Sequence, residues 1–233
     1  LQWAVLVAIQ GIPRMVFDLR FARTTLQQAS PFLGVQGTIA VRTSVSVLIL
    51  SSFCGETEVG LYSAASQLLV PLSLVFDNVA LSLFPAMCRN YEISVGSLAA
   101  VVRLIVEGLM SISLPVIIGL FVLAEVVLMA LYGDPQFLVS ANILRIIVWV
   151  PLQGALTAAI GQALWAGGRE RLTLCIVLVN TVLQVVAALL LIGSFGLYGA
   201  ATTSALVAAV SLVQHLIPGA RFLSGLRLTA FLW

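Results

Sequence analysis

Lysine is absent from this sequence of 233 residues, and charged residues of any kind are scarce. Only 9% of the residues are charged, whereas soluble globular domains carry about 25%. Hydrophobic residues make up 61% of the chain, and its mean hydropathy is +1.14. This composition argues against a soluble domain. Several apolar runs reach the roughly 20 residues that a helix needs to cross a bilayer, so we expect a polytopic helical membrane protein.

The residues that build catalytic and metal sites are equally sparse. The chain has one histidine and three cysteines, and the cysteines show neither pairing nor metal-ligand spacing. His215 has no acid close to it in sequence, so no Ser-His-Asp or Cys-His arrangement can be built around it. No phosphate-cradling loop or long soluble loop is present. We therefore expect no enzyme, no catalytic residue, no metal and no cofactor.

Six complete membrane spans are predicted, which gives an all-α fold. Residues 1–13 are apolar but too short to span, and another apolar run begins near the end of the sequence. We therefore expect truncated helices at both ends, as in a piece of a longer chain. The complete spans are predicted at residues 31–53, 59–86, 99–123, 137–166, 171–193 and 197–217.

The arginines orient these spans. Nine of the eleven arginines fall in alternate loops, and the other loops have none. The positive-inside rule places the arginine loops in the cytoplasm and explains these cations without a nucleic-acid partner. The predicted domains are residues 1–25 (the end of a preceding helix and a cytoplasmic linker), 26–218 (a six-helix lobe) and 219–233 (a cytoplasmic segment and the start of a further helix).

Arg42 is the most unusual residue, because it lies near the middle of a predicted span. A charge at that depth costs at least about 2.5–3.5 kcal/mol, so it should face protein or water. Gly34, Thr38, Arg42 and Ser46 recur every four residues and form one small, polar stripe. Asp77 lies at a similar depth in the next span. Arg42 and Asp77 could therefore form a structural ion pair, or they could line a hydrated cavity.

Other polar residues extend this pattern to further spans. Each group could serve interhelical hydrogen bonding alone, but several together favour a shared polar interior. These groups are Ser66, Gln67, Ser73 and Asp77; Thr173, Asn180 and Gln184; and Ser204, Ser211 and His215. Arg145 either reaches to the outer interface or lies at the outer mouth of the cavity. Arg103 and Glu107, spaced i, i+4, predict a surface ion pair.

Three prolines fall inside consecutive predicted spans, at Pro71, Pro115 and Pro151. Each removes a backbone hydrogen bond, which favours a bundle that bends, although proline is also common in membrane helices generally.

The segment GLYSAAS at 60–66 is echoed by GLYGAAT at 196–202. The echo is either coincidence or a sign of two close helix contacts that small residues allow.

Four blocks of this sequence resemble a known family. The first is RTSVSVLILSSFCGETEVGLYSAASQLLVPLSLVFDNVALSLFPAMCR, with its mid-span arginine, acidic turn and Phe-Pro ending. The others are LYGDPQFLVSANILRIIV, LWAGGRERL and VNTVLQVVAALLLIGSFGLYGAATTSALV. Together they resemble the carboxy-terminal half of Wzx-type polysaccharide (O-antigen) flippases. That family belongs to the multidrug, oligosaccharidyl-lipid and polysaccharide exporter superfamily.

The resemblance implies a two-lobed protein in the bacterial inner membrane. Such proteins move undecaprenyl-diphosphate-linked oligosaccharides to the outer leaflet by alternating access, in lipopolysaccharide and related pathways. The implied partners are this substrate, membrane lipids and an amino-terminal lobe of the same chain. The resemblance makes Arg42 a substrate-facing residue, and the polar pattern described above adds the other candidate substrate-binding residues, which are Asp77, Arg145, Gln67, Asn180 and Gln184.

One departure from the family pattern concerns the counter-charge of Arg42. Many relatives carry aspartate two residues after this arginine, where this sequence has Ser44. Asp77 could supply that charge.

The alternative functions are a cation-coupled multidrug exporter of the same superfamily, which predicts acidic cavity residues, and a membrane glycosyltransferase or ligase, which predicts a long outer loop.

Overall fold

The computed structural model describes residues 30, 33–35, 37–38 and 47–223, and this part of the chain is helical without strands. About half of the predicted first span lies outside the described residues, and the span is helical where it is described. Four helices in the described part are long and apolar enough to cross a membrane, and the longest contains two predicted spans. The prediction of an all-α polytopic membrane protein is confirmed.

The predicted span 59–86 is two helices in the structure, α3 (Glu56–Gln67) and α4 (Val70–Ile93). Pro71 lies in the first turn of α4, where its missing N–H removes no helical hydrogen bond. The predicted end at residue 86 is wrong, because α4 continues past Pro85 to Ile93. Ser94 then separates α4 from the next helix, and its side chain accepts a hydrogen bond from the backbone N–H of Ser97.

The third and fourth predicted spans are also subdivided. Helix α5 (Val95–Val122) runs through Pro115 and is followed by α6 (Ala124–Tyr132). The predicted span 137–166 contains α7 (Leu138–Ile147) and α8 (Val150–Ala166), and the short η1 (Pro135–Phe137) precedes α7. Pro151 lies in the first turn of α8, so two of the three predicted proline kinks are breaks between helices.

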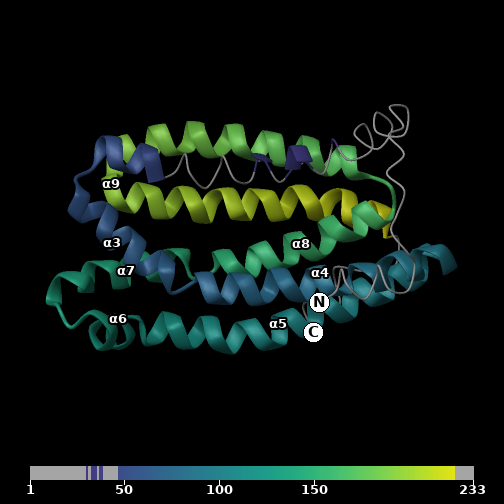
Figure 1. The fold of residues 1–233 in the computed structure, drawn as a ribbon, viewed down its shortest axis with the longest axis horizontal. Helices are drawn as coiled ribbons and strands as arrows, with labels where there is room; N and C mark the ends of the chain where they lie inside the picture. Colours follow the sequence, from purple (N-terminus) through teal and green to yellow (C-terminus); the bar gives the residue numbers. More distant parts are fainter. Residues whose placement is uncertain (1–29, 31–32, 36, 39–46, 224–233) are drawn as a thin grey trace, which may run out of the picture.

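The last element, α9 (Glu170–Phe222), contains the predicted spans 171–193 and 197–217 as two helices joined at Gly196. Gly196 has φ 55° and ψ −129°, a conformation that residues with a side chain rarely adopt. Three residues later, a Cβ atom on Gly199 would collide with the backbone oxygen of Leu191. Glycine at these two positions therefore allows the halves of α9 to fold back on each other, as Figure 1 shows.

The helices run antiparallel, as Figure 1 shows, and the loop arginines and several acidic residues lie at opposite ends of the bundle. At one end, called the arginine end, the Arg169 guanidinium lies 4.4 Å from the ring centre of Phe222, which also contacts Tyr91. The opposite, acidic end holds Glu56 and Glu58 in the first turn of α3, and Asp134 before η1. This separation is the one that the alternating arginine loops predict.

The two echoed segments pack together at the acidic end. The hydroxyl groups of Tyr62 in α3 and Ser204 in α9 are 3.0 Å apart. Ala65 and Ala201, from equivalent places in the two segments, are both fully buried in one hydrophobic cluster with residues of α6 and α7. The two echoed segments therefore contribute to the same buried cluster, while the origin of the echo stays a prediction.

Candidate functional site

An exposed stripe runs along α3 and α4 and contains the predicted residues Gln67 and Asp77. Gln67, Val70, Leu74, Asp77 and Leu81 are exposed and recur every three or four residues. Asp77 lies twelve residues before Arg89, which at about 1.5 Å per residue is roughly 18 Å from the arginine end of α4. Among the described residues it has no ion-pair partner. The stripe thus presents a carboxyl group at the middle of a membrane-length helix.

The predicted partner of Asp77, Arg42, lies outside the described residues. Two other members of its stripe are described. The Thr38 hydroxyl donates to the Gly34 carbonyl at 2.6 Å, and a Cβ atom on Gly34 would lie 3.0 Å from Leu174 of α9. This part of the first span therefore packs closely on α9. The pairing of Arg42 with Asp77 stays a prediction.

Five of the predicted polar residues of α9 are buried inside the lobe. Exposed fractions are 1% for Asn180 and 6% for Gln184, and Thr173, Ser211 and His215 are also buried. Among the described residues, neither side-chain polar atom of Asn180 has a hydrogen-bond partner. The predicted polar interior is therefore present in α9, but these side chains face neighbouring helices, unlike Asp77.

His215 illustrates this interior packing. Its Nδ1 lies 2.8 Å from the carbonyl oxygen of Ser211, one turn earlier in the same helix. Its ring lies against Gly161 of α8, where a Cβ atom would be 3.6 Å away. The ring thus fills the space that a glycine leaves between α8 and α9, which is a structural role.

Sequence reasoning missed one polar residue behind the exposed stripe, Gln162 of α8. In the amide orientation that satisfies both neighbours, its nitrogen donates to the Ala80 carbonyl at 2.6 Å and its oxygen accepts from the Leu81 N–H at 3.3 Å. These contacts attach α8 to α4 one turn after Asp77. The sequence signal that could have identified Gln162 is a glutamine within a largely apolar helix.

Arg145 has three partners that join helices at the acidic end. Its guanidinium forms an ion pair with Glu125 at 2.9 Å and donates to the side chain of Asn142 at 3.2 Å. It also donates to the Phe121 carbonyl at 3.4 Å, in the last turn of α5. The sequence analysis did not identify Glu125, which lies twenty residues away. By contrast, the predicted pair of Arg103 and Glu107 is confirmed at 2.7 Å.

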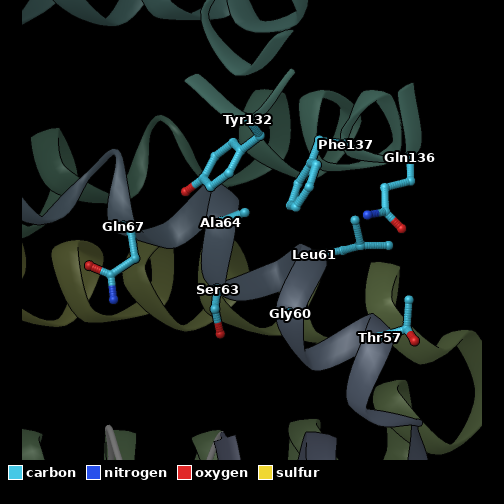
Figure 2. Close-up of a pocket in the computed structure, with 9 residues that line it drawn as sticks. All are labelled: Thr57, Gly60, Leu61, Ser63, Ala64, Gln67, Tyr132, Gln136 and Phe137. Carbon is cyan, nitrogen blue, oxygen red and sulfur yellow. The ribbon is translucent and has the colours of Figure 1, made fainter. Parts of the chain in front are cut away.

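A pocket of about 460 Å³ opens at the acidic end between α3 and the segment that joins α6 to α7 (Figure 2). Gln67 lines it, which links the pocket to the exposed stripe. The rings of Tyr132 and Phe137 are stacked, with centres 4.4 Å apart. The Asp134 carboxylate fixes the loop by accepting hydrogen bonds from both the backbone and the side-chain nitrogen of Gln136.

Comparisons with known proteins agree with this architecture. Over 172 residues the chain is 24% identical to the probable low-salt glycan biosynthesis flippase Agl15 of Haloferax volcanii, an alignment that covers 73% of this chain and 36% of the relative. Its fold is similar to that of the lipid II flippase MurJ in an inward closed conformation. The TM-score is 0.71 at 11% identity, covering 93% of this chain and 47% of that one.

The chain therefore spans between a third and a half of the length of these two relatives. The likeness to MurJ establishes the fold. Residues 2–141, more than half of the chain, match a family described as polysaccharide biosynthesis protein. The chain is thus a multi-pass membrane protein that belongs to the polysaccharide biosynthesis protein family.

Proposed function

We propose that this chain is the carboxy-terminal lobe of a flippase for undecaprenyl-diphosphate-linked oligosaccharide in the bacterial cytoplasmic membrane. The lobe is formed by residues 26–218, and an amino-terminal lobe of the same chain completes the cavity. The substrate moves from the inner to the outer leaflet by alternating access and serves polysaccharide synthesis such as that of O-antigen. The activity is transport, in keeping with the two relatives, which are both named as flippases.

The exposure of Asp77 at mid-helix carries this proposal. A carboxylate facing lipid at that depth is costly, and intramembrane charges face a bundle interior or a water-filled cavity. The described part of this lobe does not cover Asp77. A second lobe across a hydrated gap would give the carboxylate water and polar neighbours. The stripe on α3 and α4 is then this lobe's wall of the cavity.

Arg42 supplies the positive charge in this proposal. The planar guanidinium fork suits the oxygens of a diphosphate, which bears charge at the head of the lipid. In the resting cavity Arg42 pairs with Asp77, and the anionic substrate displaces the carboxylate. Both residues then belong to the substrate-binding site, and substrate binding replaces the ion pair between them.

The breaks before α4 and α8 supply places for bending. One buried cluster at the acidic end takes residues from α3, α6 and α7 and also includes Ile117 of α5 and Leu152 of α8, whereas α4, α5 and α8 share another toward the arginine end. Pro71 and Pro151 lie at the two junctions between these groups. Because helical hydrogen bonds are interrupted there, small changes in angle can move one group relative to the other.

The test is a deletion of the intact gene, followed by an assay of lipid-linked oligosaccharide in each leaflet. The expected result is accumulation in the cytoplasmic leaflet, reversed by the wild-type gene. Asp77→Leu should fail to reverse it, while Ser82→Ala, also exposed on α4, should succeed. A normal lipid distribution with new sensitivity to cationic drugs would instead identify a multidrug exporter.

A further inference from the structure

The pocket at the acidic end has the chemistry of a sugar-binding site. None of its nine described lining residues carries a charge. Its volume of about 460 Å³ lies within the roughly 300–1,000 Å³ typical of ligand sites. We propose that this pocket binds a neutral sugar ring of the transported glycan, separately from the anionic lipid head group. The inference rests on the proposed function and names a second contact for the same substrate.

The walls of the pocket combine apolar rings with hydrogen-bonding groups. Figure 2 shows Tyr132 and Phe137 side by side on one wall, with Gln67 and Thr57 on α3. A sugar ring has apolar C–H faces that pack on aromatic rings, and hydroxyl groups that pair with amides and hydroxyls. An ion would find no opposite charge among the described lining residues. A neutral, hydroxyl-rich ligand is therefore the best match.

The pocket is built before a ligand arrives. Gly133, with φ 68°, allows the chain to turn between α6 and η1. The Asp134 carboxylate then holds Gln136 through two hydrogen bonds of 2.9 and 3.0 Å. A side chain fixed in this way loses little freedom on binding, so its contacts contribute fully to affinity.

The location of the pocket fits a substrate that is charged at one end and neutral at the other. Asp77 lies seven residues after the start of α4 at Val70, which is roughly 11 Å at the helical rise of about 1.5 Å per residue, and Gln67 ends α3 just across the break. A diphosphate held near Asp77 would extend its attached sugars along the exposed stripe toward the acidic end. The pocket then receives a ring of the glycan and not the lipid.

Gly60 offers a way to close the pocket without disturbing the helix. It lines the pocket within α3, and a Cβ atom on it would meet no other atom within 4 Å. In Gly60→Leu, leucine should therefore fill the pocket and also favour the helix. Gly108 of α5 is the matched control, because it is helical, exposed and equally open but does not line the pocket.

The experiment measures binding to the intact protein in nanodiscs with two probes. One probe is lipid-linked oligosaccharide purified from the source cells, and the other is undecaprenyl diphosphate without sugar. We expect Gly60→Leu and Gln67→Leu each to weaken binding of the glycan-bearing lipid by roughly fivefold and to leave the sugar-free lipid unaffected. Gly108→Leu should change neither.

The outcomes separate the two proposals. If the pocket variants keep the wild-type preference for the glycan-bearing lipid, the pocket is not a sugar site, while the flippase proposal stands. The same conclusion follows if they weaken both probes equally. If the wild-type protein binds neither probe, the proposed function fails, and the sugar site fails with it.

Discussion

Polar residues lie in the middle of α4 and along one face of the first half of α9, but the two sets have opposite surroundings. Asp77 and Asn78 of α4 are exposed, whereas Asn180 and Gln184 of α9 are buried. A polar group in an apolar helix therefore does not by itself mark a cavity. The α9 residues are covered within this lobe, whereas the described part of the lobe leaves the α4 residues open.

The largest expected effect concerns Arg42, the proposed partner of Asp77 on α4. We expect Arg42→Ala to abolish glycan export while membrane levels of the intact protein stay near normal, because the proposed function makes this arginine a cation that contacts the substrate. Arg103→Ala is the control, since Arg103 is exposed and forms a surface ion pair with its i+4 neighbour Glu107. The measurement is lipid-linked glycan in the outer leaflet, with the protein level from immunoblots. A collapse of the protein level for Arg42→Ala would mean that the arginine is structural.

The next effect comes from two reciprocal substitutions. One replaces an amide by a carboxyl group on α9, and the other replaces a carboxyl group by an amide on α4. Asn180→Asp places a charge where only 1% of the side chain is exposed, so we expect it to reduce the free energy of unfolding by about 3 kcal/mol or more. Asp77→Asn removes a charge from an exposed position and should change stability by less than about 0.5 kcal/mol. Denaturant titration of the intact protein in detergent compares the two. Equal stability of both variants would show that water reaches Asn180.

Sequence patterns predicted most of this architecture, because membrane spans must be long and apolar and because arginine is confined to alternate loops. They identified Thr173, Asn180 and Gln184 as one face of a helix. They could not decide whether that face is packed or open, since periodicity records which residues share a face and not what covers it. Glu125, the partner of Arg145, was missed because pairing across twenty residues depends on where the break after α5 directs the chain.

A smaller effect tests how closely the halves of α9 must approach to cover the buried face. A methyl group on Gly199 would collide with the backbone of Leu191, which cannot move as a side chain can. Gly199→Ala should therefore lower stability by about 1–3 kcal/mol. At Gly193 the nearest atom to an added methyl group is the Phe53 ring at 3.7 Å, an ordinary contact. Gly193→Ala should be neutral or slightly stabilising. Thermal unfolding of the intact protein compares the two variants, and a similar loss of stability in both would contradict close approach at Gly199.

The smallest expected effect concerns the Cys54 thiol, which lies beside the Gly196 turn. It separates the effect of burial on the pKa of this thiol from the effect of the Glu58 charge. Burial, with a hydrogen bond and repulsion from Glu58, raises the pKa of the Cys54 thiol to about 11. Because the thiolate is the reactive form, maleimide labelling of Cys54 should be slow at pH 7 and accelerate up to about pH 11. Glu58→Gln removes the repulsion but leaves the burial, so labelling should become faster at pH 7 while keeping part of its pH dependence. Mass spectrometry of the labelled peptide measures this rate. An unchanged rate would assign the whole shift to burial, and a rate typical of a free thiol would assign it to the carboxylate of Glu58.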